Sequence, residues 1–386
     1  MQVVENPAAD GSRLPRLATL PGGGMIMSWV ESGEEGHKLK FAIYQHGQWI
    51  RQGEVAHGSN WFINWADFPS VVAIDQLFWV AHWLVKHPGG GTYDYDIATS
   101  YSTNAGLTWS ETQSPHRDEL ATEHGFVSIF PDGKEAGMIW LDGRESIQPK
   151  TQKNLLETSG NYQLRYARLH RDGSLGAEQV IDQNTCTCCG TTVATTTAGP
   201  VAAWRSRTDK EIRDNYVARL RNEQWSVPQP LGAEGWEING CPVNGPMLAA
   251  SGMNVTAAWF TAEGDHPRVR AAFSPDGGQN FDQTIEVDDV HPFGRVDIAW
   301  IDDRTTVISW MTALDAATKK SHLALRTISI DGTTGPIQRL IAISGGRDTG
   351  FPQLVADETG LLLAWTGTTP NHGIHTVWVA SNEFFH

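Results

Sequence analysis

The 386-residue sequence lacks the features that would tie it to a membrane, to nucleic acid or to a helical fold. No stretch approaches the roughly 18 continuous apolar residues of a membrane helix. The formal net charge is −15, and no cluster of Lys and Arg could follow a phosphate backbone. No segment has sustained helical periodicity. We therefore expect an all-β protein with no membrane span and no nucleic-acid partner.

A short apolar run that ends in tryptophan recurs along the chain. The runs end at Trp29, Trp83, Trp140, Trp204, Trp259, Trp310 and Trp365, and successive tryptophans are 54, 57, 64, 55, 51 and 55 residues apart. This spacing fits a four-stranded antiparallel sheet with its turns, so seven repeats predict a β-propeller of seven four-stranded blades over residues 1–386. We expect Ile374 to Ser381 in the last blade and Gln2 to Glu5 as its outermost strand, because such closure removes a free edge.

Two turns carry a more specific pattern. The segments Ser102 to Trp109 (STNAGLTW) and Ser274 to Phe281 (SPDGGQNF) resemble the Asp box, S-x-D-x-G-x-x-W, of the sialidase-like superfamily. In such a turn an Asp or Asn side chain accepts local hydrogen bonds, and Gly takes the left-handed position. The first segment departs from the pattern, with Asn104 in place of Asp. The resemblance implies a sialidase-like propeller, and the six blades of true sialidases are the alternative to seven.

Charged residues fall where the predicted geometry gathers them at one mouth of the central channel. In a propeller the inner strands line this channel, so the segments that lead into them meet the segments that leave the second strands. Loops on such a rigid scaffold commonly carry function. These side chains could bind a small anionic molecule or pair with one another, and the candidates for catalysis are Asp67, Asp142, Arg144, Arg205 and Arg295.

The four cysteines of the chain lie in or beside these same segments. Cys186, Cys188 and Cys189 form a C-x-C-C group before the fourth blade, and Cys241 precedes the fifth. One reading is disulfide bonding, although only a bridge to Cys241 has comfortable geometry. The other is that the four thiolates bind one soft metal ion, copper or alternatively zinc. His124, from the adjacent third blade, is a further candidate ligand or a neighbour of the site.

Longer phrases resemble those of exported bacterial sialidase-like proteins over nearly the whole chain. The phrases are NWADFP (Asn64 to Pro69), EHGFVS (Glu123 to Ser128), WLDGR (Trp140 to Arg144), CTCC (Cys186 to Cys189) and GCPVNGP (Gly240 to Pro246). The amino terminus itself has no export signal. The resemblance implies a periplasmic or secreted protein whose signal has been removed, and the alternative is a cytoplasmic one.

The same resemblance bears on catalysis. Members of the group are often labelled exo-sialidases, and true sialidases use three arginines, a Tyr nucleophile activated by Glu, and an Asp acid/base. Arg13-Leu14-Pro15 resembles the first arginine motif. The nucleophile comes from the late blades in those enzymes, whereas this chain has no Tyr after Tyr216. We therefore expect no useful sialidase activity.

Three functions remain open, and whether the chain is an enzyme is one of the open points. The first is a metal-binding propeller that holds copper or uses it in redox or thiol chemistry on a small molecule. The second is a glycoside hydrolase in which Asp67, with Asp142 or Glu263, supplies acid and base. The third is a non-catalytic propeller that binds a partner protein, with the cysteines closed as a bridge.

Overall fold

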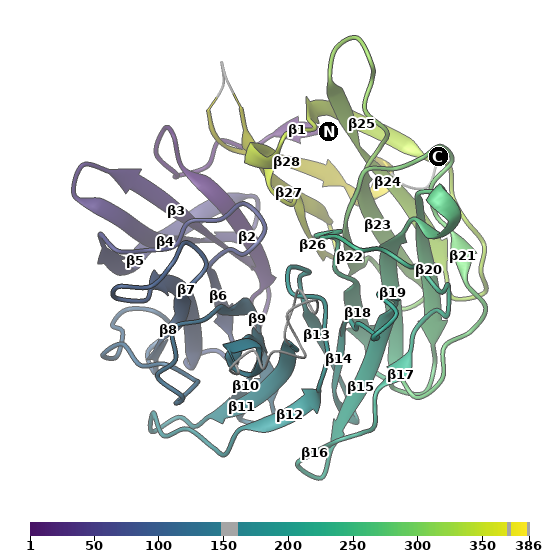
Figure 1. Ribbon diagram of the computed structural model, residues 1–386. Helices are drawn as coiled ribbons and strands as arrows, with labels where there is room; N and C mark the ends of the chain where they lie inside the picture. Colours follow the sequence, from purple (N-terminus) through teal and green to yellow (C-terminus); the bar gives the residue numbers. More distant parts are fainter. Residues whose placement is uncertain (148–160, 369–371, 384–386) are drawn as a thin grey trace.

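The computed structural model describes residues 1–147, 161–368 and 372–383. Its strands form seven antiparallel sheets around a central axis, and the innermost strand of each sheet faces the centre (Figure 1). Neighbouring innermost strands touch around much of the ring: β2 contacts β6 and β26, β13 contacts β9 and β18, and β22 contacts β18 and β26. The predicted seven-bladed propeller is confirmed, and the six-bladed alternative is wrong.

The strands of the first three blades run from the centre outward. They are β2 (Arg13–Thr19), β3 (Met25–Gly33), β4 (Gly36–Gln45) and β5 (Gln48–Gly58); β6 (Ser70–Ala73), β7 (Trp79–Lys86) and β8 (Tyr95–Ser102); and β9 (His124–Asp132), β10 (Glu135–Asp142), β11 (Gln163–Leu169) and β12 (Gln179–Asp182). An isolated bridge between Thr99 and Gln113 supplies the outer edge of the second blade.

The later blades follow the same order. The fourth contains β13 (Thr192–Thr196), β14 (Gly199–Arg205) and β15 (Asn215–Arg221), with β16 (Gln224–Trp225) and β17 (Gln229–Pro230) both paired to β15. The others are β18 (Met247–Ser251), β19 (Asn254–Thr261), β20 (Arg268–Ser274) and β21 (Ile285–Glu286); β22 (Gly294–Trp300), β23 (Thr305–Met311), β24 (Lys320–Ser329) and β25 (Gln338–Ser344); and β26 (Gln353–Asp357), β27 (Gly360–Gly367), β28 (Gly373–Ala380) and β1 (Gln2–Val3).

Helical structure in the described residues is limited to short 3₁₀ turns. They are η1 (Arg144–Ile147), η3 (Glu263–Asp265), η4 (Arg347–Thr349) and η5 (Ser381–Glu383). Over the same residues, no helix has the length and apolar character needed to cross a membrane.

The repeated tryptophans explain why the blades adhere to one another. Each lies on the second strand of its blade and is at most 5% exposed. Every interface between neighbouring blades has at least one buried apolar cluster with residues from both. Several indole N–H groups reach a carboxylate, as in Trp204 to Asp182 at 2.7 Å and Trp259 to Glu234 at 2.7 Å. The tryptophan therefore fills the interface while its polar atom is satisfied.

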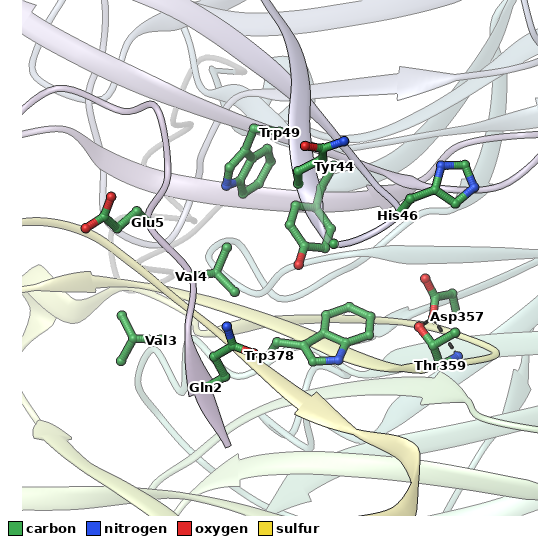
Figure 2. Close-up of a pocket in the computed structure, with 12 residues that line it drawn as sticks. Gln2, Val3, Val4, Glu5, Tyr44, His46, Trp49, Asp357, Thr359 and Trp378 are labelled. Atoms are coloured by element: carbon green, nitrogen blue, oxygen red, sulfur yellow. Dashed lines mark hydrogen bonds between the residues drawn. The ribbon is translucent and has the colours of Figure 1, made fainter.

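The ring is closed by the two ends of the chain, as the sequence predicted. Strand β1 pairs with β28, with Gln2 opposite Trp378 (Figure 1). Val4 continues the contact through its amide, which donates to the carbonyl of Thr376 at 3.0 Å. Figure 2 shows Tyr44, Trp49 and Trp378 around a pocket of about 630 Å³ beside this junction. The pocket belongs to the closure between the first and last blades.

Three innermost strands begin with the same local backbone conformation. Leu14, Phe126 and Arg295 have left-handed backbones, with φ of 59°, 54° and 53°, at places where the pairing register with the second strand shifts. In each case a side chain from the preceding blade accepts the amide hydrogen: Thr366 Oγ1 from Leu14 at 3.1 Å, Asp67 Oδ1 from Phe126 at 2.9 Å, and Asn244 Oδ1 from Arg295 at 2.6 Å. These bonds lock the blade junctions at the channel mouth.

The two turns that resemble Asp boxes form the expected local hydrogen bonds. Ser274 Oγ donates to Asp276 at 2.8 Å and accepts the amide of Gly278 at 2.9 Å. The other turn keeps this pattern with Asn104, whose Oδ1 accepts the Ser102 hydroxyl at 2.8 Å. Asn can replace Asp here without loss of this hydrogen bond, because the turn needs only an oxygen acceptor.

Candidate functional site

The structure brings the four cysteines together at the channel mouth. The C-x-C-C segment lies between β12 and β13, and the amide of Cys186 donates to the carbonyl of Arg205 at 2.9 Å, at the end of β14. Cys188 forms a disulfide with Cys241 from the segment that leads into β18, with their Cα atoms 6.1 Å apart. Cys186 and Cys189 are buried free thiols. The sulfur atoms of residues 186, 188 and 189 lie within 4.8 Å of one another.

The backbones of the two cysteine-bearing loops approach each other closely at a glycine. A Cβ atom added to Gly245 would lie 2.0 Å from the carbonyl oxygen of Gly190. Only a residue without a side chain permits this approach of two backbones. Gly245, the last glycine of GCPVNGP, therefore allows the Cys241 loop to reach Cys188.

The disulfide changes the set of sulfur donors that the sequence predicted. With the bridge closed, two thiols are available rather than four, because a disulfide sulfur is not a thiolate. The structure matches the one bridge that the spacing allowed. A site of four thiolates stays a prediction, and it applies to the reduced protein.

Cys186 is the thiol most disposed to ionise. Burial would raise its pKa, but a hydrogen bond from the Cys189 thiol and one from the Cys188 amide lower it. The positive charges of Arg205 and Arg213 act in the same direction, and the pKa of Cys186 falls to about 6. Arg213 Nη1 lies 3.5 Å from Cys186 Sγ. Burial raises the pKa of Cys189 well above its usual value. One thiolate and one thiol therefore share this buried space near neutral pH.

Arg205, a candidate catalytic residue, is part of the support of this site. Its side chain is 1% exposed and its guanidinium donates to the carbonyls of Asn244, Phe260 and Arg213. It also lies 4.9 Å from the ring centroid of Trp236. These contacts join the fourth and fifth blades, and they place a positive charge near the sulfur atoms.

Arg295 has a similar setting on the other side of the mouth. Its guanidinium donates to the carbonyls of Gly346 and Gly350 and lies 4.8 Å from the centroid of Trp65. Burial lowers the pKa of Arg295 to about 10. The side chain is 3% exposed, so it is built into the wall.

Asp67 lies in a buried group of carboxyls and tyrosines. The hydroxyl of Tyr95 is 2.7 Å from Asp67 Oδ2 and 2.9 Å from Glu123 Oε1, and the hydroxyl of Tyr162 donates to Glu123 at 3.1 Å. Burial raises the pKa of Asp67 to about 7 and that of Glu123 to about 7. Two carboxyls that exchange protons near neutral pH therefore lie at the mouth between the second and third blades. The sequence paired Asp67 with Asp142 or Glu263, whereas the structure pairs it with Glu123 through Tyr95.

Asp142 and Arg144 form an ion pair. Arg144 bonds both oxygens of Asp142, at 2.8 Å to Oδ1 and 2.7 Å to Oδ2, and the indole of Trp140 donates to the same carboxylate at 2.8 Å. Burial would raise the pKa of Asp142, but the hydrogen bonds and charge of Arg144 hold it below its usual value. The Asp142 carboxylate is therefore ionised, and both of its oxygens are hydrogen-bonded to Arg144.

His124 belongs to this acidic region, and the structure does not group it with the cysteines. Its candidate metal-binding neighbours are Asp96 and His116 on one side, and Asp118 and Asp142 on the other. Burial would lower the pKa of His124, but the hydrogen bond to Asp118 and the nearby carboxylate of Asp96 raise it to about 9. The sequence offered His124 as a further ligand or neighbour of the sulfur site, and the structure places it among carboxylates and a second imidazole.

Several functional candidates were missed from the sequence. Arg213 contacts the Cys186 thiol, and Tyr95 bridges the two carboxyls. Asp96 and His116 lie beside His124. Tyr95 and Asp96 are on the third strand of the second blade, and His116 lies in the connection to the next blade, where no motif marked them. Glu263 lies in η3.

A further pocket at the mouth contains the residue that resembled a sialidase arginine. It has a volume of about 380 Å³, and its lining includes Arg13, Asn64, Trp65 and Asp348. A smaller cavity of about 50 Å³ lies between Gly190, Gly245 and the rings of Phe68 and Phe351. The cysteine-bearing loops therefore border the interior of the channel.

Comparison with known proteins identifies the fold. No family model and no curated protein matches the chain. Among solved structures, the α-L-arabinofuranosidase Arb93A of Fusarium graminearum is 11% identical, with a TM-score of 0.53 over 100% of this chain and 99% of that one. A mutant of the NanB sialidase of Streptococcus pneumoniae is 8% identical, with a TM-score of 0.51 over 94% and 84%. The polysaccharide lyase Uly1 is 10% identical, with a TM-score of 0.50 over 97% and 90%. The chain therefore has the β-propeller fold found in sialidases and related enzymes, and this likeness says nothing of its activity.

Proposed function

We propose that this propeller binds a soft metal ion, copper(I) first and zinc as the alternative, through the sulfur atoms at its channel mouth. The observation that carries the proposal is the position of the Cys186, Cys188 and Cys189 sulfurs within 4.8 Å of one another. Sulfur donors select copper(I) or zinc over harder ions. Arg205 and Arg213 favour the thiolate form of Cys186, which is the form that binds metal.

The redox state decides how many donors take part. In the bridged protein, Cys186 and Cys189 can hold copper(I) between two sulfurs. Reduction of the bridge adds Cys188 and Cys241, the arrangement predicted from the sequence. The bound metal is either stored or used in redox or thiol chemistry on a small molecule. The resemblance to exported proteins supports a periplasmic or secreted location, where the bridge would be stable.

The test is a copper(I) competition assay under anaerobic conditions, with bridged and fully reduced protein measured separately. We expect one copper(I) per chain, and Cys186→Ser should weaken binding in both states because this thiol is free in both. Cys241→Ser should weaken binding only relative to the reduced protein. Thr187→Ser changes the same loop without touching sulfur and should bind as the parent does. Reduced, folded protein that takes up no copper(I) or zinc would exclude the proposal and would favour a partner-binding scaffold closed by its bridge.

A glycosidase remains the second candidate, and the pair of Asp67 and Glu123 favours it. Burial raises the pKa of each to about 7, as acid/base catalysis near neutral pH requires. A panel of fluorogenic sugars tests this role. Activity on any of them that Glu123→Gln abolishes, with the fold retained, would support it. Sialosides should not be turned over, because no late blade supplies a tyrosine nucleophile.

A further inference from the structure

Asp96 is surrounded by histidine. Every ion-pair partner that it has in the described part of the chain is an imidazole: His87 Nδ1 at 2.9 Å from Oδ2, His124 Nδ1 at 3.6 Å from Oδ1, and His116 Nε2 at 3.7 Å from Oδ1. Arginine is nearby but is engaged elsewhere, since Arg144 pairs with Asp118, Asp142 and Glu178. One oxygen of Asp96 thus faces two imidazole nitrogens.

The nitrogen of His124 that faces Asp96 has no hydrogen-bond partner. His124 is fully buried, at 0% exposed, and its other nitrogen, Nε2, is 3.1 Å from Asp118 Oδ2. Nε2 is therefore the donor to Asp118, and Nδ1 is the nitrogen directed toward Asp96; a metal ion there would displace the proton that the raised pKa of His124 keeps on the ring. The Nδ1 atom is buried and unpaired in the described structure. Buried polar atoms without partners are rare and indicate an absent ligand or a strained site.

His116 lies directly beside His124 and also faces Asp96. Its imidazole stacks on that of His124, with centroids 3.8 Å apart and planes 5° from parallel, and the side chain is 4% exposed. The Nδ1 atom of His116 is also buried and unpaired, 4.0 Å from Asp118. The backbone amide of Ile97 donates a hydrogen bond to Nε2 at 3.3 Å, so Nε2 carries the lone pair, and a metal ion bound there would replace this bond. Two adjacent buried imidazoles therefore present nitrogen atoms to one carboxylate.

These spacings are close to those around a bound metal ion. Ligand atoms about 2.05 Å from a tetrahedral ion lie about 3.3 Å from one another. The distances from Asp96 Oδ1 to the two imidazoles are 3.6 and 3.7 Å, so shifts of a few tenths of an ångström and a tilt of the stacked rings would complete the geometry. A ligating histidine whose second nitrogen donates to a carboxylate, as His124 does to Asp118, is the usual support of such a site.

We propose that Asp96, His116 and His124 bind a borderline divalent metal ion of the zinc(II) or copper(II) class, at a second site separate from the sulfur cluster. Asp118 positions His124, and His87 positions Asp96 through its other oxygen. Imidazole and carboxylate donors select such ions, whereas the sulfur cluster selects softer ones. A metal ion can reach the site from solvent through Asp96, because the Asp96 side chain is 27% exposed. The site requires no cysteine, so it does not depend on the proposed function of the sulfur atoms.

Cobalt(II) distinguishes the two sites in the intact, bridged protein. Bound at Asp96, His116 and His124, it should give visible d–d bands without the near-ultraviolet bands of thiolate ligation, at one ion per chain. Asp96→Asn and His116→Gln should each weaken binding at least about tenfold. His57→Gln, an exposed histidine elsewhere, is the matched control and should bind as the parent does. A cobalt-induced rise in the melting temperature of the unsubstituted protein provides a readout if either variant fails to fold.

The outcomes separate this proposal from the previous one. Cobalt(II) with thiolate bands, no cobalt(II) bound by the parent, or binding unaffected in folded Asp96→Asn would each overturn the second site. Copper(I) uptake by the cysteines would be unchanged in all three cases. Loss of copper(I) binding with retained cobalt(II) bands would instead overturn the sulfur site alone.

Discussion

At the scale of single residues, buried carboxyls at the channel mouth differ in their protonation state. Asp67 receives hydrogen bonds from the Phe126 amide and the Tyr95 hydroxyl, yet burial still raises its pKa to about 7. Burial thus outweighs two hydrogen bonds because neither donor carries a charge. Asp142, by contrast, is equally buried but remains ionised beside Arg144. The partner of each carboxyl decides its protonation state.

The raised pKa of Asp67 predicts how stability depends on pH. A carboxyl whose folded pKa is above its unfolded value contributes stability that is fully present below about pH 4 and is lost as the pH rises through about 7. Asp67→Asn removes this titration and keeps an oxygen for the Phe126 amide. Relative to the parent, the variant should gain roughly 4 kcal/mol in its free energy of unfolding between pH 4 and pH 8, since the pKa rises from 3.8 to about 7 and each pKa unit corresponds to about 1.4 kcal/mol.

Denaturant unfolding at several pH values measures this difference. Asp276→Asn is the control, because that carboxyl lies on an exposed turn and its pKa is lowered, so its contribution should be lost only in acid. A difference between parent and Asp67→Asn that stays constant from pH 4 to pH 8 would show that Asp67 is ionised throughout.

At the scale of strands and loops, the sequence predicted the scaffold well and the site partly. The tryptophan runs revealed the second strand of every blade, because a large aromatic residue recurred wherever two blades meet. The cysteines could be placed near one another because they sit in adjacent connections. The group around Asp96 could not be predicted, because it joins a third strand to a blade connection and to His124. Such neighbours depend on how two blades pack, and a single sequence carries no repeat or motif for that.

Close contact between two loops gives an element-scale prediction. Gly245→Ala would place a Cβ 2.0 Å from the Gly190 carbonyl oxygen, so one of the two backbones must move. We expect less of the Cys188–Cys241 bridge after oxidative refolding, and the count of free thiols should rise above the two of the parent. Gly240→Ala in the same loop is the control, since its nearest neighbour would be 3.7 Å away. Thiol titration under denaturing conditions gives the count, and two thiols in both variants would contradict the prediction.

The turn that ends in Trp109 should matter for stability and not for metal. Trp109 packs edge-on against Phe41, with ring centroids 6.1 Å apart, in the apolar cluster between the first two blades. Trp109→Ala should lower the free energy of unfolding by roughly 1 to 3 kcal/mol, because it removes a partly buried aromatic ring. Copper(I) bound per folded chain should remain that of the parent. A fall in metal content without a loss of stability would mean that the turn and the sulfur site are coupled.

At the scale of the whole molecule, a propeller has no free inner edge once its ring is closed. The seven interfaces each bury an apolar cluster, so opening one of them would expose two blade faces together. Closure here depends on a short strand pair, β1 with β28, and on the side chains beside it. Asn6 adds a hydrogen bond from its amide to the carbonyl of Ile374 at 2.8 Å, and Val4 packs in the cluster between the first and last blades.

Deleting residues 2–6 should therefore weaken the ring at its closure. The deletion removes the β1 pairing, the Val4 and Asn6 hydrogen bonds and the packing of Val4, and it leaves the outer edge of β28 unpaired. We expect the melting temperature to fall by about 2 to 5 °C. We also expect association that increases with concentration, because an exposed strand edge can pair with another chain. Val3→Thr is the control, because this side chain is 74% exposed and the substitution leaves the backbone pairing intact. Calorimetry and size-exclusion chromatography report the two effects, and a truncated protein that melts with the control and stays monomeric would show that the ring is held closed by the inner strands alone.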